Sequence, residues 1–246
     1  MKLSIITITY NAESVLEKTI KNVLSQSYNN FEYIIVDGLS TDNTLAIISK
    51  YASRINQVIS EKDTGIYDAM NKGLKVAKGD YVLFMNAGDS FQNELVLETI
   101  FKNSNNEDIL YGETEMINAS GKVLGLRRLR APKKLTWKSF QRGMLVCHQS
   151  IFVKREIAPL YDLQYKISAD INWIIECLKK AKTVKNTEMI IARFLIGGES
   201  KNRRLTGLKE RFTISVNHYG FTSSLFYLIY IVIRFVIQVP FYRRLV

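Results

Sequence analysis

The sequence lacks the residues and motifs that mark several common classes of protein. It contains two cysteines and two histidines, without a Cys-x-x-Cys pair or a cluster of these ligands, which excludes a zinc module of familiar spacing. It has no Gly-x-x-x-x-Gly-Lys loop, no Gly-x-Gly-x-x-Gly after the first predicted strand and no Gly-x-Ser-x-Gly elbow. These absences argue against P-loop nucleotidases, dinucleotide dehydrogenases and hydrolases with a nucleophile elbow. The N-terminus enters a predicted strand at once and shows no signal-peptide pattern, which favours a reduced, cytoplasmic setting.

Acidic residues are missing from one long stretch. Between Lys122 and Arg155 there are ten Lys and Arg residues and no Asp or Glu. Residues 1–121 hold 10 basic and 16 acidic residues (net −6), and residues 122–246 hold 24 and 7 (net +17), which gives the total of +11. Such a basic run meets the phosphates of a ligand, an anionic lipid or a nucleic acid, or forms a solvated face. Because no RNA- or DNA-binding module is recognisable, we predict no nucleic-acid partner.

Apolar, β-branched runs alternate with amphipathic stretches along the first hundred residues. The predicted strands are 3–9, 31–36, 57–60 and 81–85, and the predicted helices are 14–25, 42–51, 66–77 and 94–102. This alternation predicts an α/β fold in which helices cover both faces of a mostly parallel sheet. Residues 109–115 and 123–127 predict a hairpin, so the sheet should be mixed, and strands at 150–153 and 189–194 flank a helix at 170–180. We predict one domain over 1–205 and a helical tail over 206–246.

Acidic and amide side chains follow the predicted strands or begin the helices after them. They are Asn11, Asp37, Asp63, Asp68, Asn71, Asn86 and Asp89. Ligands of open α/β sheets bind at the carboxyl ends of the strands, so we expect these side chains to gather at one edge. A carboxylate such as Asp89 suits a metal or a metal-diphosphate pair there, and the alternative is that it caps the next helix.

Four stretches together carry a resemblance to a known family. They are Ile5 to Asn11, Ile34 to Thr44, Asp63 to Gly73 and Asn86 to Asp89. Over about residues 1 to 200 the chain resembles the family 2 glycosyltransferases of the GT-A (Rossmann-like) fold, especially bacterial members that build cell-envelope polysaccharides. The resemblance implies a hexosyltransferase that moves a sugar, with inversion, from a nucleoside-diphosphate donor to a hydroxyl of a lipid-linked or polysaccharide acceptor. A UDP-sugar is the expected donor.

The resemblance also assigns roles to individual residues. The nucleotide-sugar donor is expected at Thr9, Tyr10, Asn11, Asp37, Asp68, Asn71 and Asn86, and Asp89 is expected to bind Mg²⁺ or Mn²⁺. The family usually shows an Asp-x-Asp or Asp-Asp pair, whereas this chain has Asn86 and a single Asp89, so the second protein ligand is not identified. One carboxylate with substrate phosphates and waters is adequate for such a cation. The alternative function is an inactive nucleotide-sugar-binding or membrane scaffold protein of the same fold.

The second half supplies the acceptor side. Asp170, at the start of a predicted helix, matches the position of the family's catalytic base, and a carboxylate there accepts the proton of the acceptor hydroxyl. Its alternative role is a helix N-cap. His148 and Gln149 resemble a stretch near the acceptor, and Gly198 and Arg203 belong to a glycine-hinged loop that we predict to be mobile.

The last segment, 221–241, carries only Arg234 as a charge. A full membrane span needs about 20 apolar residues. A narrow polar stripe, together with Arg243 and Arg244, instead favours a helix that lies in the interface of an anionic membrane. We therefore expect a cytoplasmic protein that is peripheral on the inner face of the cell membrane. The alternative is a helix packed on the domain or on a partner subunit, and the oligomeric state stays open.

Overall fold

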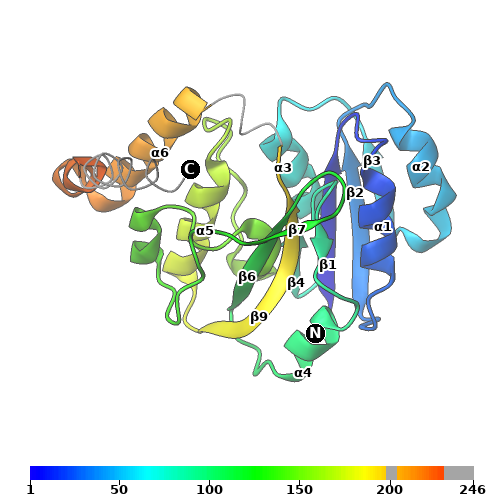
Figure 1. Ribbon diagram of the computed structural model, residues 1–246, viewed down its shortest axis with the longest axis horizontal. Coiled ribbons are helices and arrows are strands. Elements are labelled where there is room, and N and C mark those ends of the chain that lie inside the picture. The colour runs from blue at the N-terminus through cyan, green and yellow to red at the C-terminus, as the bar shows by residue number, and fades with distance from the viewer. Residues whose placement is uncertain (198–203, 230–246) are drawn as a thin grey trace, which may run out of the picture.

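A computed structural model describes residues 1–197 and 204–229, apart from the side chain of Arg204 (Figure 1). Its strands are β1 (Leu3–Thr9), β2 (Phe31–Asp37), β3 (Gln57–Ser60), β4 (Tyr81–Phe84), β5 (Ser90–Phe91), β6 (Ile109–Ile117), β7 (Val123–Leu126), β8 (Ile151–Lys154) and β9 (Val184–Leu195). Its α-helices are α1 (Leu16–Leu24), α2 (Thr44–Lys50), α3 (Ile66–Val76), α4 (Val96–Lys102), α5 (Ala169–Lys180) and α6 (Arg204–Tyr219). The short 3₁₀ turns are η1 (Ala52–Arg54), η2 (Trp137–Arg142), η3 (His148–Ser150) and η4 (Arg155–Ile157).

The described strands form one mixed sheet in the order β3-β2-β1-β4-β8-β6-β9-β5, and β7 pairs with β6. The first four strands of this order are parallel, as the sequence predicts. β8 is antiparallel to both of its neighbours, and β6 and β9 are parallel to each other. The carboxyl ends of β1, β2, β4, β6 and β9 therefore meet at one edge of the sheet, where the predicted site residues should gather.

The sheet separates two apolar cores. On one face Ile6 and Ile8 of β1 pack with residues of α3 and α5, and on the other Leu3 and Ile5 pack with residues of α1, α2 and α4. All seven residues of β1 are buried, which is the pattern of a strand covered by helices on both sides. The predicted arrangement of a mostly parallel sheet between two layers of helices is confirmed.

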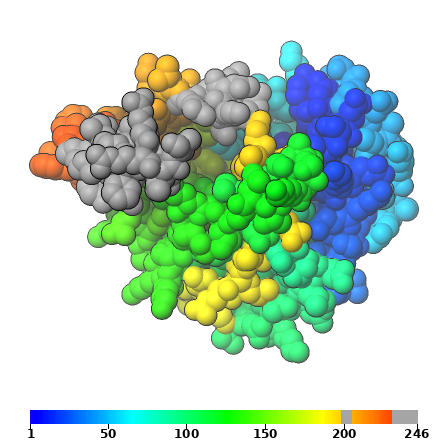
Figure 2. Space-filling view, viewed as in Figure 1, coloured from blue at the N-terminus to red at the C-terminus, as the bar shows by residue number. Residues whose placement is uncertain are grey.

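α6 lies beside α5 and runs in the same direction (Figure 1). Near its start Gly207 contacts Ile167, just before α5, and at its end Tyr219 reaches Trp137 of η2. Ile214 of α6 is buried in the core that contains α5. In Figure 2 the hairpin region, in green, lies between the N-terminal helices, in blue, and the C-terminal helical segment, in orange.

The helical tail is described only in part. Gly220 follows α6 with a φ of +83°, and residues 221–229 are helical. Among the helices that the structure describes, none is long and apolar enough to cross a membrane. The rest of the predicted tail helix, the predicted mobile loop and its residues Gly198 and Arg203 lie outside the described residues.

Candidate active site

Two residues that the sequence assigns to the donor lie side by side at the strand ends. Thr9 ends β1 and Asp37 ends β2, and they are paired in the parallel register. The carboxylate of Asp37 is fully buried and accepts hydrogen bonds from the hydroxyl and main-chain N–H of Ser40 and from the hydroxyl of Ser60. The hydroxyl of Thr9 is buried and, within the described residues, has no hydrogen-bond partner. A fixed carboxylate thus adjoins an unused hydroxyl.

The loop after β1 closes tightly against its neighbours. Asn11 has a φ of +46°, and its side-chain oxygen accepts a hydrogen bond from Thr41 N at 2.8 Å. A Cβ atom added at Gly38 would lie 2.4 Å from Oδ2 of Asp63 and 3.3 Å from the ring of Tyr10, so a larger residue would displace the Asp63 carboxylate. The ring of Tyr10 is 62% exposed at this edge. The ends of β1 and β2 therefore meet the segment after β3 and present an accessible aromatic ring.

Asp89 is a buried carboxylate beyond the end of β4. Only 4% of the residue is exposed, its Oδ2 accepts a hydrogen bond from Gln149 Nε2 at 2.7 Å, and its Oδ1 accepts one from Leu195 N at 3.0 Å. Burial raises the pKa of Asp89 to about 6, although the two hydrogen bonds oppose this change. The alternative that Asp89 caps the next helix is wrong, because α4 begins at Val96 and its N-cap is Leu95.

Asn86, His148 and Asp170 form a chain of side chains across the site. Asn86 Nδ2 lies 3.1 Å from His148 Nε2, and His148 Nδ1 lies 3.8 Å from Asp170 Oδ2. With Asn86 Nδ2 as the donor, the neutral imidazole carries its proton on Nδ1, the atom nearer to Asp170. The other carboxylate oxygen of Asp170 lies 3.3 Å from the Tyr67 hydroxyl, which donates to Ile167 O at 2.8 Å. His148 thus lies between Asn86, assigned to the donor side, and the candidate base Asp170, although its buried Nδ1 has no hydrogen-bond partner in the described residues.

Asp170 lies in the first turn of α5, whose N-cap is Ser168. The alternative that Asp170 is itself the N-cap is therefore wrong. Its Oδ1 accepts a hydrogen bond from the N–H of the next residue, Ile171, at 2.9 Å. Because the side chain is half-buried, it keeps a solvent-accessible part that a substrate hydroxyl could contact.

Asp68 and Asn71 of α3 are occupied by contacts within the protein. Asn71 is buried, donates to Tyr161 O at 2.9 Å and accepts from Tyr161 N at 2.7 Å. Asp68 accepts a hydrogen bond from Thr64 N at 2.9 Å and lies 3.9 Å from the ammonium of Lys72. These two side chains hold the start of α3 and the segment around Tyr161 in place, so their polar atoms are already engaged within the protein.

Sequence reasoning missed one residue of the acceptor side. The carboxylate of Glu210, on α6, accepts hydrogen bonds from the main-chain N–H groups of Lys166, Ile167 and Ser168 at 2.7, 2.9 and 2.9 Å. These residues immediately precede Asp170 and α5. A carboxylate at this place satisfies N–H groups that a helix start leaves without partners. No local pattern could reveal it, because Glu210 is 42 to 44 residues away from its partners.

The described residues contain no group of three or more His, Cys, Asp or Glu side chains that could hold a metal ion. Two features still suit a hard cation. The buried Asp89 carboxylate has no hydrogen bond or ion pair with a cationic side chain in the described residues, and the buried Oδ1 of Asn86 has no hydrogen-bond partner there. Carboxylate and amide oxygens are the ligands that Mg²⁺ and Mn²⁺ prefer. The donor set fits a cation with a single protein carboxylate.

Comparison with known proteins decides the family. The sequence model described as "Glycosyl transferase family 2" matches residues 4–158, more than half of the chain. The chain is a family 2 glycosyltransferase. The predicted family and enzyme class are thereby confirmed, and the catalytic chemistry of the family is the transfer of a sugar.

Curated relatives of this glycosyltransferase share about a third of its residues. It is 32% identical over 205 residues to a PGL/p-HBAD biosynthesis glycosyltransferase of Mycobacterium tuberculosis, which covers 78% of this chain and 75% of the relative. It is also 32% identical over 143 residues to WfgD of Escherichia coli, named UDP-Glc:alpha-D-GlcNAc-diphosphoundecaprenol beta-1,3-glucosyltransferase, covering 57% of this chain and 55% of WfgD.

Solved structures share the fold of this glycosyltransferase. The S. aureus TarS fragment 1–349 in complex with UDP-GlcNAc matches with a TM-score of 0.67 at 18% identity, covering 91% of this chain and 69% of the fragment. The mannosyltransferase PcManGT from Pyrobaculum calidifontis, in complex with GDP-Man and Mn²⁺, matches with a TM-score of 0.65 at 14% identity, covering 92% and 73%. The expected GT-A fold is confirmed.

Proposed function

We propose that this glycosyltransferase moves a sugar from a nucleoside-diphosphate donor, with a UDP-sugar as first candidate, to a hydroxyl of a lipid-linked or polysaccharide acceptor. The observation that supports the proposal is the position of His148 between Asn86, after β4, and the half-buried carboxylate of Asp170, at the head of α5. The name of WfgD, a UDP-Glc enzyme with a lipid-diphosphate acceptor, and the UDP-GlcNAc complex of TarS support this choice of substrates.

The donor nucleotide is proposed to lie over the ends of β1 and β2. The exposed ring of Tyr10 offers a stacking surface for the base, and the buried Thr9 hydroxyl has unused hydrogen-bonding capacity beside it. Asp37 is held rigidly by its serine partners, as a carboxylate that binds ribose hydroxyls should be. Asn11 orders this loop, while Asp68 and Asn71 shape the donor side through the contacts of α3.

The reaction is proposed to be a single displacement with inversion. The oxygen of the acceptor hydroxyl forms a bond to the anomeric carbon of the donor, and Asp170 accepts the proton of that hydroxyl. The bond from that carbon to the diphosphate oxygen breaks, and the nucleoside diphosphate leaves with the electron pair. The main-chain N–H of Ile171 donates to the carboxylate of Asp170, and the Tyr67 hydroxyl and His148 lie beside it. Gln149 and Leu195 keep Asp89 fixed at the far side of the site.

Asp89 is proposed as the carboxylate ligand of Mg²⁺ or Mn²⁺, with Asn86 beside it. When bound, such a cation neutralises the charge that develops on the departing diphosphate. A bound cation would stabilise the ionised carboxylate of Asp89, because burial leaves its charge without a compensating positive charge and raises its pKa. The Mn²⁺ complex of PcManGT supports a divalent cation in enzymes of this fold.

The enzyme is also proposed to lie on the inner face of the cell membrane, against anionic lipid. The helical residues 221–229 expose Phe221 at 59% and Phe226 at 75%, so an apolar surface is available before the undescribed part of the tail begins. Such a surface binds a membrane by burying apolar area, and neighbouring cations add electrostatic attraction. A lipid-linked acceptor would be presented at the same membrane.

The test is transfer by the full chain. The protein is incubated with UDP-sugars and a polyprenyl-diphosphate sugar acceptor, with and without Mn²⁺, and the release of UDP and the anomeric configuration of the product are measured. The proposal requires acceptor-dependent release and an inverted product. A second candidate, a scaffold that binds nucleotide sugars without catalysis, is favoured by the lack of a three-ligand cluster among the described residues. Binding of UDP-sugar with neither transfer nor hydrolysis would select it.

A further inference from the structure

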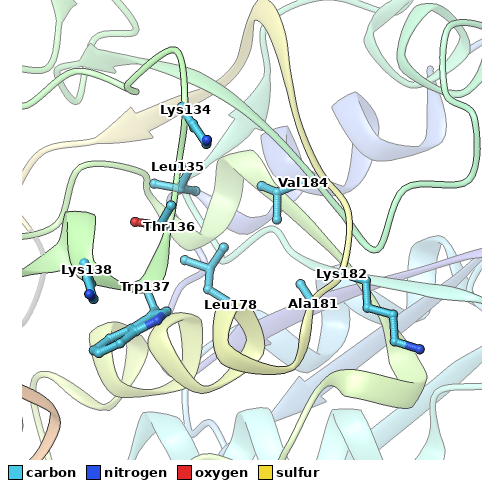
Figure 3. Close-up of a pocket in the computed structure, with 9 residues that line it drawn as sticks. All are labelled: Lys134, Leu135, Thr136, Trp137, Lys138, Leu178, Ala181, Lys182 and Val184. Atoms are coloured by element: carbon cyan, nitrogen blue, oxygen red, sulfur yellow. The ribbon is translucent and has the colours of Figure 1, made fainter.

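A pocket lies at the opposite end of α5 from Asp170. It is a pocket of about 480 Å³ that Lys134, Lys138 and Lys182 line together with apolar side chains and Trp137. Leu178, near the end of α5, also lines the pocket. It lies eight residues after Asp170 in the helix, so at a rise of 1.5 Å per residue Leu178 and Asp170 are about 12 Å apart along the helix axis. Figure 3 shows the three lysines spread around an apolar centre of Leu135, Leu178 and Val184. The proposed reaction does not use this pocket.

The pocket has an excess of uncompensated positive charge. Its lining contains no carboxylate, and within the described chain no ion pair is formed by the ammonium groups of Lys134, Lys138 or Lys182. Asp108 is nearby, but its carboxylate is taken by the ammonium of Lys154 and by main-chain N–H groups, including that of Lys182. All three side chains are exposed, so their charge is available to a ligand. A pocket of this kind attracts an anion.

An apolar surface adjoins this charge. The ring of Trp137 stacks on Tyr219 at the end of α6, with 5.5 Å between ring centroids, and the ammonium groups of Lys138 and Lys179 lie 5.5 and 5.4 Å from the Trp137 centroid. The exposed Phe221 follows Tyr219 by two residues. Cations beside exposed aromatic and aliphatic side chains match a membrane interface, where phosphate groups lie above the acyl chains.

We propose that the pocket binds the phosphate headgroup of an anionic lipid when the enzyme lies on the membrane. The lysines contact the phosphate, and the apolar centre and Trp137 contact the upper part of the lipid. The proposal rests on the membrane partner of the proposed function and names where on the surface that partner binds. It also gives a role to part of the acid-free run between residues 122 and 155, to which Lys134 and Lys138 belong.

The test uses the full chain and vesicles of phosphatidylcholine with or without phosphatidylglycerol. The triple variant Lys134→Gln, Lys138→Gln, Lys182→Gln is compared with Lys18→Gln, Lys50→Gln, Lys75→Gln, a matched variant that removes three exposed charges from α1, α2 and α3. Each lysine near an anionic surface contributes roughly fivefold to binding, so the pocket variant should co-sediment about 100-fold more weakly and the control near the parent. Donor hydrolysis in vesicle-free solution should stay at the parental rate in both variants, which separates this proposal from the proposed catalytic function.

A fluorescence arm places the lipid in the pocket. The chain has two tryptophans, and Trp173 is buried in the core, so Trp137 should report on vesicles that contain phosphatidylglycerol. The change should disappear in Trp137→Phe. Equal loss of binding in both triple variants would overturn the proposal, because general charge would then explain the association. The proposal would also be overturned if millimolar inorganic phosphate changed the fluorescence of Trp137 and anionic vesicles did not compete with the phosphate. The pocket would then be a site for a soluble phosphate.

Discussion

The buried carboxylate of Asp89 should make the stability of this enzyme depend on pH in an unusual direction. Burial raises its folded-state pKa from 3.8 to about 6, so ionisation favours the unfolded chain. Below about pH 4 the group is protonated in both states and costs nothing. Above about pH 6 it is charged in both, and a shift of about two pKa units destabilises the fold by about 3 kcal/mol. Stability from this group therefore falls as pH rises from 4 to 6.

The assay is urea unfolding of the parent and of Asp89→Asn at several pH values. Other groups titrate in the same range, so the informative quantity is the difference between the two free energies of unfolding. Relative to the variant, the free energy of unfolding of the parent should fall by about 2 kcal/mol between pH 4.5 and 7.5. The fall is smaller than about 3 kcal/mol because Asp89 is already partly ionised in the unfolded chain at pH 4.5. The variant Asp162→Asn is the control, since in the described part of the chain the hydrogen bonds to the Asp162 carboxylate come from Gln164 in the same turn. The difference between the free energies of unfolding of Asp162→Asn and the parent should change little over this pH range.

The same ionisation controls the proposed cation. A metal ligand must be deprotonated, so Mn²⁺ with UDP should raise the melting temperature of the parent above pH 6 and lose this effect below it. Asp89→Asn should show no metal effect at any pH. Two results would refute the reasoning about Asp89. Parallel stability profiles for parent and variant would show that its charge is compensated in the fold, and an undiminished Mn²⁺ effect in the variant would remove it from the metal site.

Four further changes test the site and the tail. Asp170→Asn keeps shape and donor binding but removes the base, so transfer should fall by about 10² to 10⁴, and retention within about threefold would reject the assignment. Glu210→Gln leaves main-chain N–H groups before Asp170 poorly paired, so the free energy of unfolding should fall by about 1 to 3 kcal/mol and kcat should fall more than the donor KM changes. The exposed control Glu156→Gln should match the parent. An unchanged kcat in Glu210→Gln would limit the role of Glu210 to stability. Gly38→Ala brings a methyl group within 2.4 Å of the Asp63 carboxylate, which must rotate away, so UDP binding by calorimetry should weaken while the free energy of unfolding in urea falls by about 1 kcal/mol or less; parental UDP binding would contradict this. Truncation after Tyr219 keeps α6 and the lysine pocket but removes the apolar tail, so it should weaken co-sedimentation with anionic liposomes, and failure of the full chain to co-sediment would make the tail a packing element.

The parallel part of the fold could be predicted closely, because its signal is local. Strands β1, β2 and β4 are short apolar runs bounded by turn residues, and they are buried on both faces, so their residues do not alternate between apolar and polar. The sequence predicts β9 only from Met189, whereas the strand begins at Val184. The prediction starts late because Val184 to Thr187 are mostly polar and lack the alternation of a strand. The two-residue β5 exists only through its pairing with β9, so no local pattern predicts it.

The site divides in the same way. The carboxylates and amides after strands could be found because chain order places them at one edge of the sheet. Their partners could not, since Asp89 is bonded to residues 60 and 106 positions away in the chain. The bridge from Asn86 to His148 spans 62 positions. Such contacts are fixed by the packing of the mixed half of the sheet, which sequence periodicity does not encode.

The hold of Glu210 on the residues before Asp170 bears on how such an enzyme could be redesigned. The family model matches residues 4–158 and so ends before both α5 and α6. An acceptor-binding half grafted from a relative with a boundary at residue 205 would bring a new α5 without the carboxylate that holds its entry. The smallest exchangeable piece is therefore the pair of helices, and a chimera that transfers both should keep the proposed base, at the position of Asp170, correctly oriented.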